Sequence, residues 1–94
     1  QFAEEAVDLP SVDELARVHE TEPDNLDICY QLAVREVVLG HFQTALELAM
    51  TILKTDREFR DDVGRTTMIR IFAVLGKGSD LASRYRRQMF NYMH

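Results

Sequence analysis

The chain has 94 residues, of which 46% are hydrophobic, and a formal net charge of −5, so it is long enough for one domain with its own core. It has no apolar run long enough to span a bilayer, and its single cysteine excludes an internal disulfide framework. Residues 1–27 hold nine acidic residues and one basic residue, whereas residues 28–94 hold seven acidic and ten basic residues. We interpret these charges as solvated helix faces.

The first ten residues are expected to form a linker or loosely packed arm that ends at Pro10. This segment is acidic, rather than basic and then apolar, so no signal peptide is expected. The chain begins with Gln rather than Met, and we therefore expect it to be a fragment of a longer protein. The folded domain is expected to span residues 11–94.

Residues 11–22 are predicted to form the first helix. Ser11 is a suitable N-cap, and Glu14 three positions later completes a capping box. Pro23 ends this helix, and Asp24 or Asn25 can cap the next one. The residues expected on its inner side are Val12, Leu15, Ala16 and His19.

The stretch 26–59 predicts two antiparallel helices joined by a tight turn at Gly40, because glycine adopts positive φ without a steric penalty. Apolar residues of each helix follow the i, i+3, i+4, i+7 spacing of a buried stripe. In the first helix they are Ile28, Cys29, Leu32, Ala33, Val37 and Leu39, and in the second Phe42, Ala45, Leu46, Ala49, Ile52 and Leu53.

Two further helices are predicted after residue 59, joined by a turn at residues 76–78, and Ser79 is the expected cap of the last one. Gly64 lies inside the first of them and costs roughly 1 kcal/mol relative to alanine in a helix interior. We therefore expect this helix to begin or bend near Gly64. The residues expected to face inward on the last helix are Leu81, Ala82, Tyr85, Met89, Phe90 and Met93.

The predicted fold is all-α: a right-handed stack of antiparallel helical hairpins with about five helices, similar to tetratricopeptide repeats. That motif is a helix-turn-helix of about 34 residues with small and aromatic residues at fixed positions. Starting at Leu26, the matching positions are Leu32, Ala33, Gly40, Phe42 and Ala45, and after two extra residues near Asp61 they are Met68, Ile69, Phe72 and Gly76. The first repeat departs from the motif at Cys29, Glu36, Ile52 and Arg57.

No constellation of catalytic or metal-binding residues is recognised, so we expect neither an enzyme nor a cofactor. His19, His41 and His94 are far apart, and none has a ligand partner at metal-binding spacing on its own helical face. Cys29 is interpreted as a small core residue, the alternative being a mixed disulfide with a partner. The chain has no glycine-rich phosphate loop, and the Asp61–Asp62 pair is interpreted as helix N-terminal charge.

Binding of another polypeptide is the remaining function, and two surfaces are candidates. A groove that suits an extended hydrophobic peptide is predicted from the exposed face of the first helix of each pair, unless the N-terminal arm or another domain covers it. Its residues are Tyr30, Val34, Val37, Val38, Thr66, Arg70, Ala73 and Val74. The second surface is the polar face of the last helix, formed by Arg84, Arg87, Gln88 and Asn91, for which a solvated face is the simpler interpretation.

Residues 11–94 resemble the C-terminal part of YbbN-type thioredoxin-like proteins, the chaperedoxins. The matching residues are Arg60, Asp61, Asp62, Arg65, Phe72, Leu75, Gly76, Leu81, Tyr85, Arg86 and Arg87. The resemblance implies a bacterial cytoplasmic co-chaperone whose thioredoxin-like domain lies outside this chain. It also implies that the repeats hold unfolded or oxidised clients and that the last helix contacts the GroEL chaperonin.

We therefore expect a non-enzymatic interaction module with protein partners and no membrane partner. The alternative is a structural domain that self-associates as a homo-oligomer or braces the thioredoxin domain. Nucleic acid is not expected as a partner, because Arg84, Arg86 and Arg87 lie in a net-acidic chain without a longer basic stripe.

Overall fold

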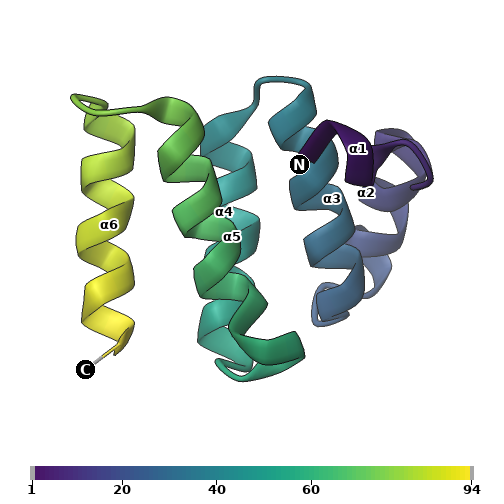
Figure 1. Cartoon of the computed structure of the whole chain (residues 1–94). Helices are drawn as coiled ribbons and strands as arrows, with labels where there is room; N and C mark the ends of the chain where they lie inside the picture. The colour runs from purple at the N-terminus through teal and green to yellow at the C-terminus, as the bar shows by residue number, and fades with distance from the viewer. Residues whose placement is uncertain (1, 94) are drawn as a thin grey trace.

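The computed structural model describes residues 2–93, and within this range the chain is all-helical (Figure 1). Its helices are α1 (Phe2–Ala6), α2 (Val12–Thr21), α3 (Leu26–Val38), α4 (Phe42–Thr55), α5 (Phe59–Leu75) and α6 (Asp80–Met93). This confirms the predicted stack of helical hairpins, to which α1 adds a sixth, short helix. No helix in the described range is long and apolar enough to cross a membrane.

The helices begin where their capping residues predict. The Ser11 side chain accepts a hydrogen bond from the Glu14 backbone N–H at 3.2 Å, and that of Asn25 accepts one from the Ile28 N–H at 3.3 Å. Ser79 accepts one from the Ala82 N–H at 3.1 Å at the start of α6. Each bond satisfies a backbone donor that has no partner inside its helix.

Glycines at positive φ form the corners of the stack. Gly40 has a φ of 82° between α3 and α4, and Gly76 has a φ of 81° between α5 and α6. Both corners were predicted. They let α3, α4, α5 and α6 run as neighbouring antiparallel rods, with α4 in contact with each of the other three (Figure 1).

The core lies along α4. Its fully buried Ala45 and Ala49 leave room for close packing, and Leu46 is fully buried beside them. On the α2 side, Leu15 packs in a second cluster with Leu32, Ala33 and Leu48. Helix α2 thus packs against α3 at one side of the stack.

The start of α5 contains a left-handed turn. Arg60, Asp61 and Asp62 have φ values of 48°, 57° and 68°, so the regular helix begins after Asp62. The regular helix therefore begins near Gly64, as predicted. Asp61 and Asp62 belong to this left-handed turn and not to the first regular turn of the helix.

At Gly64, α5 lies close to the backbone of α4. A β-carbon at this position would lie 2.9 Å from the Leu53 backbone nitrogen and 3.2 Å from the Ala49 carbonyl oxygen. A real β-carbon does not approach backbone atoms so closely. The glycine therefore serves the packing of α5 on α4, which its position in the sequence did not reveal.

The N-terminal segment contains a helix where a linker or arm was expected. Phe2 and Ala6 of α1 are 7% and 3% exposed and belong to the main core cluster. A five-residue helix is too short to be stable alone, and it forms here because its apolar side packs on α3. Phe90 also differs from its prediction: it is 51% exposed rather than directed inward.

Candidate protein-interaction surfaces

The first candidate surface is the groove predicted on α3 and α5, here called the α3–α5 surface. Its residues are Tyr30, Val34, Val37, Val38, Arg70 and Val74. Val34 is fully buried and Val37 is 7% exposed, and both belong to an apolar cluster that includes Phe2 and Ala6 of α1. In contrast, Val38 and Val74 are 47% and 55% exposed. Helix α1 therefore covers part of this surface and leaves the rest open.

Polar contacts hold α1 on the surface. The Tyr30 hydroxyl donates a hydrogen bond to the Glu5 carboxylate, and the Arg70 guanidinium forms an ion pair with the same carboxylate. The Arg70 guanidinium also lies over the Phe2 ring, 4.0 Å from its centroid. One arginine of α5 thus contacts both a carboxylate and an aromatic ring of α1.

The protonation states of these groups favour the contact at neutral pH. Burial raises the pKa of Glu5, but the hydrogen bonds from Arg70 and Tyr30 outweigh burial, and the net pKa lies below the ordinary value. Burial, followed by the hydrogen bond to Glu5, raises the pKa of Tyr30. The hydrogen bond to Glu5 raises the pKa of Arg70. An ionised carboxylate therefore meets a neutral phenol and a charged guanidinium.

The segment after α1 is held through its backbone. Arg35 of α3 donates hydrogen bonds to the carbonyl oxygen of Leu9 at 2.6 Å and to that of Pro10 at 2.9 Å. An arginine that binds main-chain carbonyls recognises the peptide backbone rather than a particular side chain. This part of α3 thus binds a stretch of chain largely independently of its sequence.

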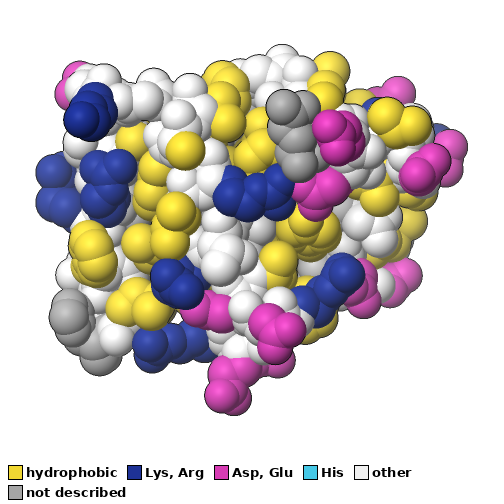
Figure 2. Space-filling model, viewed as in Figure 1, with side chains coloured by type: hydrophobic (Ala, Val, Ile, Leu, Met, Phe, Trp, Pro, Cys, Tyr) yellow, Lys and Arg dark blue, Asp and Glu magenta, His cyan; other side chains and the backbone are white. Residues whose placement is uncertain are grey.

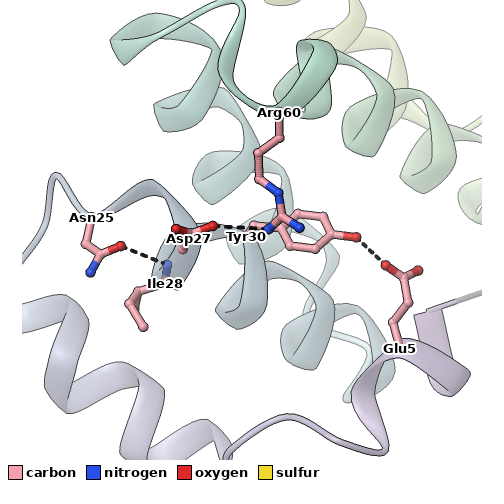
Figure 3. Close-up of polar contacts among 6 residues, drawn as sticks. All are labelled: Glu5, Asn25, Asp27, Ile28, Tyr30 and Arg60. Atoms are coloured by element: carbon pink, nitrogen blue, oxygen red, sulfur yellow. Dashed lines mark hydrogen bonds and ion pairs between the residues drawn. The ribbon is translucent and has the colours of Figure 1, made fainter.

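Tyr30 also connects α3 to the left-handed turn of α5. Figure 3 shows its ring between Arg60 and Glu5, with the Arg60 guanidinium 5.5 Å from the ring centroid. Arg60 forms an ion pair with Asp27 at 3.1 Å. The pair joins exposed side chains and contributes little to stability on its own. The Arg60 guanidinium nevertheless lies beside the Tyr30 ring, whose hydroxyl contacts Glu5.

The structure adds a surface that was not predicted. It is an apolar groove of about 820 Å³ between α5 and α6, here called the α5–α6 groove. Figure 2 shows hydrophobic side chains gathered between these two helices, with basic side chains beside them. From α5 the groove is lined by Arg65, Ile69, Phe72, Ala73 and Gly76, and from α6 by Ser83, Arg86, Met89, Phe90 and Met93. Lys77, Gly78 and Ser79 close the end at the turn.

The charged residues of this groove are all basic. Arg65, Lys77 and Arg86 are among its lining residues, and none of the lining residues is acidic. Arg86 lies over the Phe72 ring, 5.0 Å from the centroid, and Arg65 is paired with Asp62 at 2.5 Å. The groove combines an apolar floor with a positive rim.

The second surface predicted from the sequence is the polar face of α6. Arg84, Arg87, Gln88 and Asn91 are all exposed and lie around one shallow depression together with Phe90. Tyr85, on the opposite side of the helix, is buried, and its hydroxyl donates a hydrogen bond to Glu47 at 3.2 Å. Helix α6 therefore packs through one face and presents this polar face to solvent.

Comparison with known proteins assigns the family. A family model described as Tetratricopeptide repeat matches residues 5–94, which is nearly the whole chain. The chain belongs to the tetratricopeptide repeat family. No curated protein matches it. Tetratricopeptide repeats mediate interactions between proteins, so a protein partner is expected for this member.

In this tetratricopeptide repeat chain, Cys29 is a core residue. It is fully buried, its thiol lies 3.8 Å from the imidazole of His19, and burial followed by the charge of Asp24 raises its pKa. The sequence did not predict the contact with His19, because α2 and α3 bring the two residues together. Groups of three or more potential metal ligands are absent from residues 2–93, and His94 lies outside the described residues.

The sequence left open whether the N-terminal arm or another domain covers the α3–α5 surface, and the structure places α1 of that segment on it. Glu5 was not singled out, because a carboxylate in an expected arm gives no sign of its two partners. The α5–α6 groove was also missed. Ala73 was assigned to the first groove and lines the second one instead. An apolar Phe90, three and four positions after Arg87 and Arg86, was the signal that could have indicated an open groove.

Proposed function

We propose that this chain is the polypeptide-binding repeat domain of a cytoplasmic thioredoxin-like co-chaperone, and that its α3–α5 surface binds unfolded or oxidised clients. One observation carries the proposal: a piece of polypeptide, α1 with the segment after it, already occupies this surface. It is held by apolar burial, a carboxylate contact and two backbone carbonyls. A client segment with similar features could use the same contacts.

In this proposal α1 is exchanged for the client. Release of α1 would expose Val34 and Val37 and would free Tyr30 and Arg70 for a client carboxylate or aromatic ring. Arg35 would bind the client backbone, a contact that tolerates many sequences. Low sequence selectivity is what a protein that holds unfolded chains requires.

The resemblance to chaperedoxins supports a second partner, a GroEL-type chaperonin, for the polar face of α6. Arg84, Arg87, Gln88 and Asn91 are exposed on this helix and are not needed for its packing. Their two guanidinium groups would recognise acidic side chains of the chaperonin. The two partners would then bind to different sides of the stack.

The client hypothesis is tested by loosening α1. Glu5→Ala removes the contacts with Tyr30 and Arg70 and should increase the binding of a probe client, the reduced insulin B chain, measured as suppression of its light scattering. Glu4→Ala is the matched control, since Glu4 is an exposed glutamate of the same helix. Equal suppression by the wild type and by the two variants would contradict exchange of α1.

The chaperonin hypothesis is tested by charge reversal rather than by truncation. Deletion of residues 80–94 would remove buried Tyr85 and Met89 and would damage the core. The double variant Arg84→Glu/Arg87→Glu keeps the packed face and should weaken binding to immobilised GroEL at least tenfold in surface plasmon resonance. Arg17→Glu/Arg57→Glu is the control with equal charge change. Unchanged binding of the first variant would reject the docking role.

Self-association through the α3–α5 surface has less support than client binding. Val34 and Val37 are already buried within the chain, in a cluster that includes Phe2 and Ala6 of α1. A symmetric dimer there would first have to displace two α1 helices. Sedimentation of the full chain at several concentrations measures this directly.

A further inference from the structure

We propose that the α5–α6 groove binds an acidic amphipathic helix of another protein. This goes beyond the proposed function, because it concerns a surface on which neither the client nor the chaperonin was placed. Ile69 and Phe90 are 42% and 51% exposed on opposite walls of the groove. In a repeat stack, each pair packs its apolar side against a neighbour. No element within residues 2–93 covers this apolar side of the α5–α6 pair.

The packing of the stack indicates the shape of the occupant. Helix α5 lies against the preceding pair, contacting α4 closely and α3 at fewer positions. The α5–α6 pair presents the same kind of packing surface to a further helix. The lining residues Arg65, Ile69 and Phe72 of α5 and its C-cap Gly76 recur at helical spacing, so the groove follows the helix for roughly 17 Å at 1.5 Å per residue. This length accommodates about three helical turns.

A helix fits this groove better than an extended strand. The walls are the sides of two helices, whose backbone groups are already paired within each helix. An extended chain would place its own backbone N–H and C=O groups against apolar Ile69 and Met89 without partners. A helix satisfies these groups internally and presents side chains at i, i+3, i+4 and i+7 as anchors.

The charge of the groove selects an acidic partner. Lys77 and Arg86 lie along its length together with Arg65, which is already paired with Asp62, and α6 as a whole carries three arginines against one aspartate. Glutamates on the flanks of a bound helix would therefore meet opposite charge along the α6 wall and at the turn. The same basic residues disfavour a symmetric dimer through this groove, because each copy would present arginines to the other.

The fold of the chain supplies an internal precedent for this recognition. Helix α1 is acidic and amphipathic, and it docks with Phe2 below Arg70 and Glu5 paired to the same arginine. In the α5–α6 groove, Arg86 lies over Phe72, an aromatic ring of the groove itself. A glutamate of a bound helix would pair with Arg86 there, and its apolar anchor would contact Ile69 and Phe90.

The probe is a fluorescein-labelled, 14-residue helical peptide with leucines at i, i+3, i+4 and i+7 and glutamates at the flanking positions. Its binding to the full chain is measured by fluorescence anisotropy. We expect saturable binding that weakens as NaCl is raised, and at least about tenfold weaker binding of the same peptide with lysine in place of glutamate. Phe90→Ala and Arg86→Glu should each weaken binding of the acidic peptide about tenfold or more.

Two controls match these variants. Tyr92→Ala removes another exposed aromatic residue of α6, and Arg17→Glu makes the same charge change on α2; each should change the affinity by less than about twofold. Neither Phe90 nor Arg86 is buried, so circular dichroism of all variants should match the wild type.

Three results would overturn the proposal. The first is no binding of the acidic peptide at 100-micromolar protein, and the second is equal binding by Phe90→Ala and the wild type. The third is a concentration-dependent dimer in sedimentation that Phe90→Ala dissociates, which would assign the groove to a second copy. The client and chaperonin assays alter other residues. A negative result in either of them would therefore not contradict binding of an acidic helix in the α5–α6 groove.

Discussion

Replacement of Gly64 by alanine distinguishes the effect of packing from that of helix propensity. The two effects change the free energy of unfolding in opposite directions. In an exposed helix, alanine is more stable than glycine by roughly 1 kcal/mol. At Gly64, however, the new β-carbon would lie 2.9 Å from the Leu53 backbone nitrogen and 3.2 Å from the Ala49 carbonyl oxygen. Backbone atoms cannot turn away as a flexible side chain can, so α5 must move away from α4.

The expected change in the free energy of unfolding follows from the cost of overpacking and the gain in helix propensity. Overpacking of a tight contact costs about 1–3 kcal/mol, and a contact below 3.0 Å with backbone lies at the upper end. After subtraction of the propensity gain, we expect Gly64→Ala to lower the free energy of unfolding by about 1–2 kcal/mol. The midpoint of thermal unfolding should fall by roughly 4–8 °C per kcal/mol for a domain of this size.

Urea and thermal unfolding followed by circular dichroism measure this change. Gly64→Ser, which adds one more atom at the same place, should be less stable than Gly64→Ala. Val74→Ala, at an exposed position of the same helix, should instead gain a few tenths of a kcal/mol from propensity. A Gly64→Ala variant that is more stable than the wild type would refute the close approach of α5 to α4.

Three further predictions concern individual side chains. The pKa of Glu5 is lowered in the folded state, so the stability that Glu5 contributes is present above its ordinary pKa and lost as pH falls through the folded-state value. The stability difference between wild type and Glu5→Gln, about 1 kcal/mol or less for this partly exposed pair, should be seen at pH 7 and should shrink as the pH falls below the ordinary carboxyl pKa in urea titrations. Asn25→Ala removes the cap of α3 and should lower the free energy of unfolding by about 0.5–2 kcal/mol, whereas a change below 0.3 kcal/mol would contradict the bond to the Ile28 N–H. The Cys29 thiol, fully buried and with a raised pKa, should react with Ellman's reagent at least about tenfold more slowly in the native protein than in urea, and equal rates would contradict its burial.

Local signals in the sequence predicted most of the fold correctly. Ser11, Asn25 and Ser79 cap helices because their side chains reach a backbone N–H three residues later, which depends only on local spacing. Gly40 and Gly76 mark corners because their conformation is also a local property. Periodic apolar residues then determine which side of each helix is buried.

The features that sequence did not reveal depend on contacts between distant segments. Helix α1 forms because Phe2 and Ala6 find a buried site on α3, and five residues alone give no such signal. Gly64 has the sequence signature of a helix breaker, and its actual role depends on the backbone of α4. Phe90 lies at an inward position by periodicity but faces a groove that no described element of the chain fills.

The left-handed turn at residues 60–62 affects how the repeats of this chain can be recognised. Gly40 and Gly76 lie 36 positions apart, whereas the repeat period is about 34 residues. The additional residues fall next to this turn, ahead of Gly64, so α5 still meets α4 in the correct register. The helices therefore repeat regularly in space, although the additional residues interrupt the repeat in the sequence. An alignment to a fixed period would place every position of the second repeat two residues out of phase.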